Sequence, residues 1–363
     1  MTANVTRPFS PDYSVPPGRT LLEILETVDI SQAELAERTG RPKKTVNEII
    51  KGKAAITPDT ALQLERVLGK PSAGFWISLE QQYRASLARL QEREMLSKHT
   101  DWLSELPIGD MISRGWIRAQ KDKIDMVREL LGFFAVASPA AWEEVWRTYR
   151  KATAFRRSAN LSDNFGVMAA WLRRGEIEGR QLECEPFNAS RFKAALKRIR
   201  SLTTEEPNRA CELTIEECAA AGVAVVLVPE LPKLRLFGAT RWLSAEKALL
   251  QLSLHYKRDD QFWFSFFHEA GHILLHGKRD IFVEQAGSDD LDEQEANKFA
   301  SDYLVPQDEY LDFCAGGDFT RPAVLKFSKR IGISPSIVVG RLQHDKIIKF
   351  SEHNDLHTRL DWA

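Results

Sequence analysis

Two histidines four residues apart, with a glutamate directly after the first, are the residues of this sequence best suited to chemistry. They form the run His268-Glu269-Ala270-Gly271-His272. Side chains four apart on a helix lie on one face, so both imidazoles can reach a single zinc ion. Glu269 then lies close enough to take a proton from a water at the metal, as in zinc hydrolases. The alternative is a helix with two histidines by accident, in a chain with only eight histidines.

A catalytic zinc site needs a third protein ligand beside two histidines. His276 continues the four-residue spacing, but it lies about 12 Å from His268 along a helix axis. One straight helix therefore cannot bring all three imidazoles to one ion, and we expect His276 to cap the helix or to support a ligand. The sequence does not identify an oxyanion donor, since Tyr303 lies off the inward face of its expected helix.

A carboxylate from the acidic segment 280–312 is the better candidate for the third ligand. At about 100° per residue, Glu293 shares a helical face with small and apolar residues, whereas Glu295 lies beside charged ones. We therefore predict Glu293 as the third ligand and Glu295 as a solvated charge. The alternative for Glu293 is an ordinary acid in the first turn of a helix, where the helix dipole favours it.

The composition excludes several classes of protein. The formal net charge is −1, so any contact with nucleic acid must come from a local patch. Residues 1–18 have no apolar core, so they predict a flexible arm and not a secretory signal. The four cysteines form no C-x-x-C pair and are expected to be reduced thiols. Since no apolar run reaches about 18 residues, we expect a cytoplasmic protein without a membrane span.

A series of short helical patterns runs from about residue 19 to 90. Ser31 with Glu34 forms a capping box that begins one helix, and Gly40 ends it. A further helix is expected at 42–51, and Thr57 before Pro58 begins the next one. With the long helical segment 75–96, the pattern predicts a five-helix unit that contains a helix, a glycine turn and a second helix.

Positive charge is concentrated around this second helix. Residues 38–53 contain six basic residues and one acid, Glu48. DNA phosphates attract such a patch, and a helix-turn-helix places the beginning of its second helix in the major groove. The predicted DNA contacts are Gln32, Arg41, Lys43, Lys44, Thr45, Asn47, Lys51 and Lys53. The alternative is a small helical domain with a solvated basic edge. Two more basic clusters, at 147–157 and 191–200, have contact with DNA as one interpretation, but we favour solvated helix faces for both.

The rest of the chain predicts a mainly α fold with a small β-sheet, of the α+β class. Five tryptophans between 96 and 220 are expected to pack a helical core: Trp102, Trp116, Trp142, Trp146 and Trp171. Apolar β-branched runs predict strands at 223–228, 236–243 and 248–254. Helices are expected at 261–276, where Gly277 is the stop signal, and at 292–304, 322–330 and 335–347.

Five regions follow from these patterns. They are the arm 1–18, a helix-turn-helix DNA-binding domain with a linker helix at 19–95, a helical middle region at 96–220, a zinc metallopeptidase-like domain at 221–315 and a C-terminal helical segment at 316–363.

Two parts of the sequence resemble known families. The run F-F-H-E-A-G-H-I-L-L-H, followed by E-x-x-A-N-x-F-A-x-x-Y-L-V-P, is similar to the ImmA/IrrE-type zinc metallopeptidases over roughly 222–310. The resemblance implies a zincin-like, gluzincin-type endopeptidase with zinc on His268, His272 and Glu293, and Glu269 in catalysis. Several members of this family cleave a specific partner repressor and do not digest proteins broadly.

The second resemblance covers about 19–85. The run Ile30-Ser31-Gln32-Ala33-Glu34-Leu35-Ala36, the run G-K-x-x-I-T-P-D-T-A-L-x-L at 52–64 and Phe75-Trp76 resemble HigA-type antitoxins of the Xre helix-turn-helix class. One departure is that Arg41-Pro42-Lys43-Lys44 replaces the usual start of the recognition helix.

Together these observations predict an antitoxin-like, DNA-binding transcriptional regulator fused to a zinc-dependent endopeptidase. Its expected partners are double-stranded operator DNA, bound as a homodimer on an inverted repeat, and a protein substrate such as a repressor or toxin. The alternative is a non-catalytic antitoxin or repressor whose zinc domain only senses or docks a partner. A purely structural zinc site is disfavoured, because Glu269 stands beside an open three-ligand site.

Overall fold

The computed structural model divides the chain into two compact units, residues 1–100 and 101–363. The structure describes residues 15–146, 165–232, 234, 236–253, 257–276, 282–283 (backbone only) and 291–360. The expected arm up to residue 14, the basic cluster at 147–157 and the Gly277 stop signal lie outside the described residues. Within those residues, no helix is both long and apolar enough to cross a membrane.

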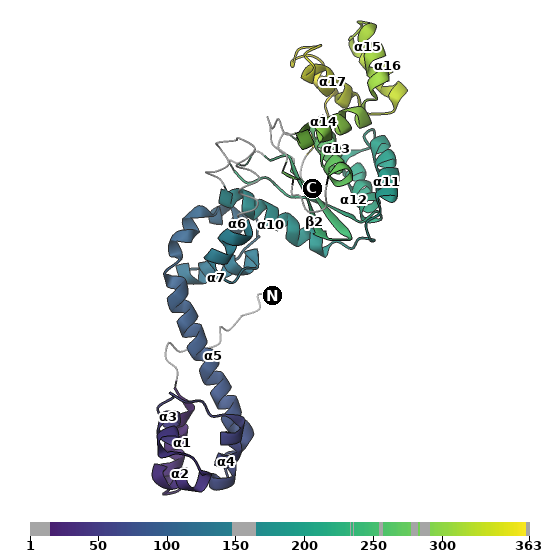
Figure 1. Ribbon diagram of the computed structural model, residues 1–363. Helices are drawn as coiled ribbons and strands as arrows, with labels where there is room; N and C mark the ends of the chain where they lie inside the picture. Colours follow the sequence, from purple (N-terminus) through teal and green to yellow (C-terminus); the bar gives the residue numbers. More distant parts are fainter. Residues whose placement is uncertain are drawn as a thin grey trace, which may run out of the picture. The chain divides into compact units, whose positions relative to one another are not determined.

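The first unit is a bundle of five helices. They are α1 (Pro17–Thr27), α2 (Gln32–Thr39), α3 (Lys43–Ile50), α4 (Pro58–Leu68) and α5 (Ala73–Ser97), seen at the purple end of the ribbon in Figure 1. The predicted caps are present: Ser31 accepts a hydrogen bond from the Glu34 N–H, and Gly40 ends α2 with a φ of 67°. The core that holds the bundle together contains Leu21, Leu35, Val46 and Trp76.

The second unit begins with helices and an aromatic core. The elements are η1 (Thr100–Glu105), α6 (Ile108–Ser113), α7 (Lys123–Phe134), α10 (Phe165–Gln181), α11 (Ala189–Leu202) and α12 (Pro207–Ala219). Trp102, Phe134 and Trp142 pack with ring centroids 5.6–6.2 Å apart. Of the five tryptophans expected in the core, four are buried and Trp116 is half-buried.

A four-stranded mixed sheet follows, in the order β1-β3-β2-β4. β1 (Val223–Leu227) runs parallel to β3 (Lys247–Leu252), and β2 (Gly238–Ser244) lies antiparallel to β3 and to β4 (Phe282–Val283). The sequence predicted the first three strands but not β4, whose two residues are too short to form a pattern. The predicted mainly α fold with a small sheet is confirmed.

Alternating residues of the strands face helices on opposite sides of the sheet. On one side, Gln251 of β3 donates to the Trp171 carbonyl of α10 (2.8 Å), and Arg241 of β2 pairs with Glu176 of α10 (2.9 Å). On the other side, Thr240 of β2 contacts Glu269 of α13 (Asp259–Leu275). The sheet therefore lies between two helices, with α13 on one face and α10 on the opposite face.

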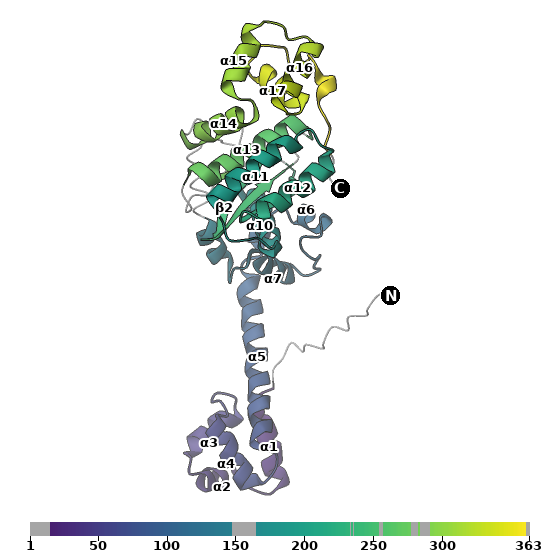
Figure 2. The ribbon, with the colours of Figure 1, turned by 90° about the vertical axis from the view of Figure 1, so that its right-hand side faces the viewer.

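The last helices are α14 (Leu291–Leu304), α15 (Gln307–Ala315), α16 (Arg321–Ile331) and α17 (Pro335–His344), followed by η2 (Asn354–Leu356); Figure 2 shows α13 to α17 together. Both α14 and α17 pack against α13, and α16 packs against α17. Arg200 donates to the carbonyls of Leu304 and Ile331, at the ends of α14 and α16. This member of the second basic cluster is therefore half-buried and joins helix ends, and it is not part of a solvated face.

Asp259, at the beginning of α13, joins three segments. One carboxylate oxygen accepts a hydrogen bond from the Ser336 hydroxyl of α17 (2.5 Å). The other oxygen accepts one from the Thr358 N–H near the C-terminus (2.9 Å). The beginning of α13 is therefore held by residues that come much later in the chain.

Candidate functional site

Helix α13 is buried along most of its length because it lies between the sheet and α14. All residues from Ser265 to Ile273 are buried. Gly271 marks the closest approach of the two helices: a Cβ atom there would lie 3.1 Å from the Phe299 ring and 3.4 Å from the Ala296 Cα. Side chains of α13 and α14 can therefore meet without bridging a wide gap.

Two imidazoles and one carboxylate converge between these helices. The Nε2 atoms of His268 and His272 lie 3.0 Å apart. The Glu293 oxygens lie 3.1 Å from the Nε2 of His268 and 3.7 Å from that of His272. The exposed fractions of the three residues are 1%, 1% and 2%. Atoms bound at about 2.1 Å around a tetrahedral ion lie about 3.4 Å apart, so this donor set fits one zinc ion.

The opposite ring nitrogens of both histidines are engaged. The Nδ1 of His268 lies 3.0 Å from the Asn297 Oδ1, and the Nδ1 of His272 lies 2.9 Å from the Nδ1 of His276. Because an amide oxygen only accepts, His268 carries its proton on Nδ1 and keeps the Nε2 lone pair available for a metal. His276 thus contacts a ligand candidate from its C-cap position.

Asn297 was missed as a functional residue, although a signal was available. It follows Glu293 by one helical turn and therefore shares its face.

Glu295 lies on the exposed side of α14, with 65% of its side chain accessible, and its carboxylate is 3.4 Å from the Nε2 of His276. The Tyr303 hydroxyl donates to the carbonyl of Lys193 on α11.

Glu269 is fully buried, and its carboxylate contacts strand β2. The Thr240 hydroxyl donates to its Oε2 at 2.5 Å. A Cβ atom at Gly238 would lie 2.6 Å from the Oε1, so only glycine leaves room for this carboxylate. Nothing in the sequence pointed to either residue, because they lie about 30 residues before Glu269 on a separate element.

The protonation states at this site suit a metal. Burial, together with the nearby His268 and His276, lowers the pKa of His272 to about 4, so its imidazole stays neutral. Burial alone would raise the pKa of Glu293, but its hydrogen bonds and charge interactions with His268 and His272 outweigh this and hold that pKa well below the usual range. A neutral imidazole and an ionised carboxylate are the forms that bind zinc.

The predicted DNA-contact residues lie on and around α3 in the first unit. Lys43 and Lys44 are exposed at the beginning of α3 and Asn47 one turn later, and Gln32, Lys51 and Lys53 are exposed beside this helix. Arg41 is half-buried, and its Nε donates to the Gln63 Oε1 of α4 at 2.6 Å. Thr45 is also half-buried. The beginning of α3 therefore presents two lysines and an asparagine on one surface.

A second group of possible ligands lies at the beginning of α13 but is already neutralised. Asp259, Asp260 and His357 come close together there. The Arg258 guanidinium donates to both oxygens of Asp260 (3.0 and 2.9 Å) and contacts the ring of His357. The Arg258 guanidinium therefore already balances the charge of Asp260.

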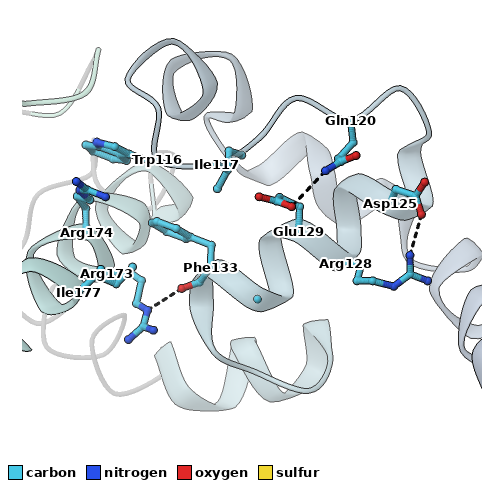
Figure 3. A pocket seen from close by; sticks show the side chains of 11 residues that line it. Trp116, Ile117, Gln120, Asp125, Arg128, Glu129, Phe133, Arg173, Arg174 and Ile177 are labelled. Atoms are coloured by element: carbon cyan, nitrogen blue, oxygen red, sulfur yellow. Dashed lines mark hydrogen bonds and ion pairs between the residues drawn. The ribbon is translucent and has the colours of Figure 1, made fainter. Parts of the chain in front are cut away.

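The cavity drawn in Figure 3, of about 510 Å³, lies between α7, α10 and the segment 116–120. Several charged side chains form hydrogen bonds with other residues that line this cavity. Arg128 donates to Asp125 (2.7 Å), Arg173 donates to the Phe133 carbonyl (2.8 Å), and Glu129 accepts from Gln120 (3.2 Å). None of the three candidate metal ligands lines this cavity.

Comparison with known proteins finds a family match in two separate stretches of the chain. Residues 21–75 match the helix-turn-helix family, and residues 233–343 match the IrrE N-terminal-like domain, a peptidase domain. The chain is 36% identical over 62 residues to virulence-associated protein A of Dichelobacter nodosus; this covers 17% of the chain and 61% of that protein, less than two thirds of its length.

Another relative is matched over most of its length. The uncharacterized HTH-type transcriptional regulator YddM of Escherichia coli (strain K12) is 30% identical over 82 residues, which is 23% of this chain and 84% of the relative. Among solved structures, a HigA-family addiction module antidote protein from Coxiella burnetii is 31% identical, with 23% of this chain and 92% of that chain covered and a TM-score of 0.22.

The antitoxin HigA of Pseudomonas aeruginosa, solved with the higBA promoter, is 32% identical, with 23% and 90% covered and a TM-score of 0.22. The convergent histidines and Glu293 lie within the stretch 233–343 that matches the peptidase domain. The chain therefore belongs to the helix-turn-helix transcriptional regulators and joins to that domain an IrrE N-terminal-like peptidase domain.

Proposed function

We propose that this protein is a DNA-binding, antitoxin-like transcriptional regulator whose second unit is a zinc-dependent endopeptidase. It cuts a specific partner protein, such as a repressor or a toxin. The observation that carries this proposal is the convergence of two imidazole nitrogens and one carboxylate beside the buried Glu269. The exposed Lys43, Lys44 and Asn47 on α3, together with the likeness to a transcriptional regulator, support the DNA-binding part.

The chemistry divides between the metal and the chain. His268, His272 and Glu293 would hold the zinc, which when bound polarises the scissile carbonyl and makes water more acidic. Glu269 accepts the proton of the water that attacks the carbonyl carbon, and it passes this proton to the amine that leaves as the C–N bond breaks. Thr240 bonds one oxygen of Glu269 and fixes its rotamer.

The test compares the wild-type chain with Glu269→Gln, which keeps the metal ligands but removes the base. Each is produced in cells, its metal content is measured, and new protein N-termini in the cell extract are identified by mass spectrometry. We expect about one zinc per chain in both, as for a three-ligand catalytic site, and new N-termini only with the wild type.

The outcomes separate the alternatives. Zinc in both proteins without any wild-type-specific cleavage would mean that the second unit senses or docks a partner. A chain without zinc would show that the metal assignment is wrong.

A further inference from the structure

A cavity of about 430 Å³ borders the candidate metal centre. Phe264, one turn before His268, lines it, and the two ring centroids lie 6.3 Å apart. Asn297, one turn after Glu293, lines it as well and bonds to His268. One helical turn is about 5.4 Å, so the cavity begins about that far from the metal ligands.

The walls of this cavity are largely apolar. The apolar side chains come from the segment before β2, from α13 and α14, and from α17 and the residues after it: Phe237, Phe264, Leu304, Val305, Ile337 and Phe350. The volume falls in the range of about 300–1,000 Å³ that is usual for ligand pockets.

Charged side chains at the rim are paired with one another. Arg258 donates to Asp260 at 2.9 Å, and Arg341 donates to Asp345 at 2.8 Å. A charged ligand would have to compete with these partners and lose its hydration against apolar walls. The cavity therefore suits an uncharged, apolar occupant.

We propose that this cavity is the specificity pocket of the endopeptidase and that it receives a large apolar side chain, such as phenylalanine or leucine, next to the scissile bond of the partner protein. This inference rests on the proposed peptidase function. Residues of an extended peptide are spaced about 3.4 Å apart, so a neighbour of the scissile bond reaches a pocket one helical turn from the metal ligands.

Ser301 controls the free volume of the pocket. It lies on α14 one turn after Asn297, is half-buried and lines the cavity with a small side chain. Ser301→Phe would place a ring in the cavity, whereas Ser301→Ala leaves the space open. Lys298→Phe is the matched control, because Lys298 is exposed on the same helix and does not line the cavity.

The experiment measures binding, so it does not depend on turnover. Two probes are titrated calorimetrically into the zinc-loaded full chain: the hydroxamates of N-acetylphenylalanine and of N-acetylglycine, which share one metal-chelating group. We expect the phenylalanyl probe to bind at least about tenfold more tightly, because its ring leaves water for the apolar cavity. Ser301→Phe should abolish this preference, while Ser301→Ala and Lys298→Phe should keep it.

The two probes also separate the two proposals. Equal affinity of both probes for the wild-type chain would contradict the proposed specificity pocket but not the proposed metal centre. If neither probe binds, the metal centre and the pocket are both overturned. The wild-type comparison needs no variant, so a Ser301→Phe protein that fails to fold would not obscure the answer.

Discussion

At the scale of single residues, the candidate metal centre needs unprotonated Nε2 atoms on His268 and His272. His268, Glu269 and His272 were predictable because their spacing within one helix determines their mutual positions. Glu293 followed from the face of a second helix. Asn297 and Thr240 were not predicted, because their contacts depend on how α13 crosses α14 and β2, which no local pattern encodes.

Removal of the Asn297 side chain should weaken zinc binding. In Asn297→Ala, His268 loses the acceptor that keeps its proton on Nδ1, so we expect zinc affinity to fall by about 10–100-fold. A competition titration with a chromophoric chelator measures the change. Asn297→Asp, which keeps an acceptor oxygen, should bind zinc like the wild type; equal losses in both variants would contradict the role of the hydrogen bond.

Thr240 should affect turnover and leave metal binding alone. Thr240→Val keeps the shape of the side chain but removes the hydroxyl that bonds Glu269. We expect kcat for cleavage of the partner to fall by about 10-fold or more, within the usual contribution of general-base catalysis, with little change in KM. Thr240→Ser should restore kcat. A rise in KM alone, or loss of zinc from Thr240→Val, would argue against a positioning role.

At the scale of elements, prediction succeeded where the signals were local. The N-caps Ser31 and Thr57 lie where they were expected, because each cap needs only a neighbouring N–H. Strand β4 and helix α15 were not predicted: β4 has two residues, and α15 buries only Tyr310. The contact between α10 and the face of the sheet opposite α13 was not predicted either. It joins residues 80 positions apart, which no local sequence pattern relates.

The beginning of α3 should carry the electrostatic contact with DNA. Lys44 is exposed there, and its Nζ lies 3.9 Å from Glu48, a distance that leaves the ammonium group largely solvated. Lys44→Ala should weaken binding to duplex DNA and reduce the slope of log affinity against log salt by about 1, as loss of one phosphate contact requires.

Fluorescence anisotropy at several salt concentrations measures this slope. Lys98→Ala removes a charge from the exposed end of α5 and serves as the control, with no expected change. Equal effects of the two variants would show only an unspecific dependence on net charge.

The contact between α10 and β2 should make stability depend on pH. Burial would raise the pKa of Glu176, but Arg241 and Arg173 outweigh it and lower this pKa to about 2. The folded pKa lies below the unfolded value of about 4.3, so the stabilisation is present above pH 4–5 and disappears as pH falls towards 2.

We therefore expect Glu176→Gln to lower the free energy of unfolding by about 3 kcal/mol at pH 7 and by much less near pH 2. Urea unfolding of the wild type and the variant across this range measures the difference. Glu178→Gln, which removes a more exposed pair with Arg174, should cost less than about 1 kcal/mol. A pH-independent loss for Glu176→Gln would contradict the ionic origin of the effect.

At the scale of the whole molecule, the chain consists of two units, each with its own candidate site. The candidate DNA contacts all lie in residues 32–53, and the candidate metal ligands all lie in residues 268–293. The division into a helix-turn-helix part and a peptidase part could be predicted, because each part has its own motif. The packing of α10 against the sheet could not, because helical patterns alone do not say which helices cover a sheet.

Zinc should therefore stabilise only the second unit. At a free zinc concentration of about 100 times Kd, binding adds about 2.7 kcal/mol, which raises the Tm of this unit by roughly 5 °C or more. Differential scanning calorimetry with zinc and with a chelator measures both transitions. The transition of the first unit should not move, and His272→Ala should remove the shift; equal shifts of both transitions would show that the units unfold together.

The hydrogen bonds of Asp259 have a consequence for how the protein is made. Its partners Ser336 and Thr358 leave the ribosome 77 and 99 residues after it, which takes roughly 5–20 seconds at usual rates of synthesis. The beginning of the helix that carries His268 and His272 can therefore gain these two bonds only late in synthesis, long after the first unit has been translated. A chain that ends before Ser334 would lack both of them.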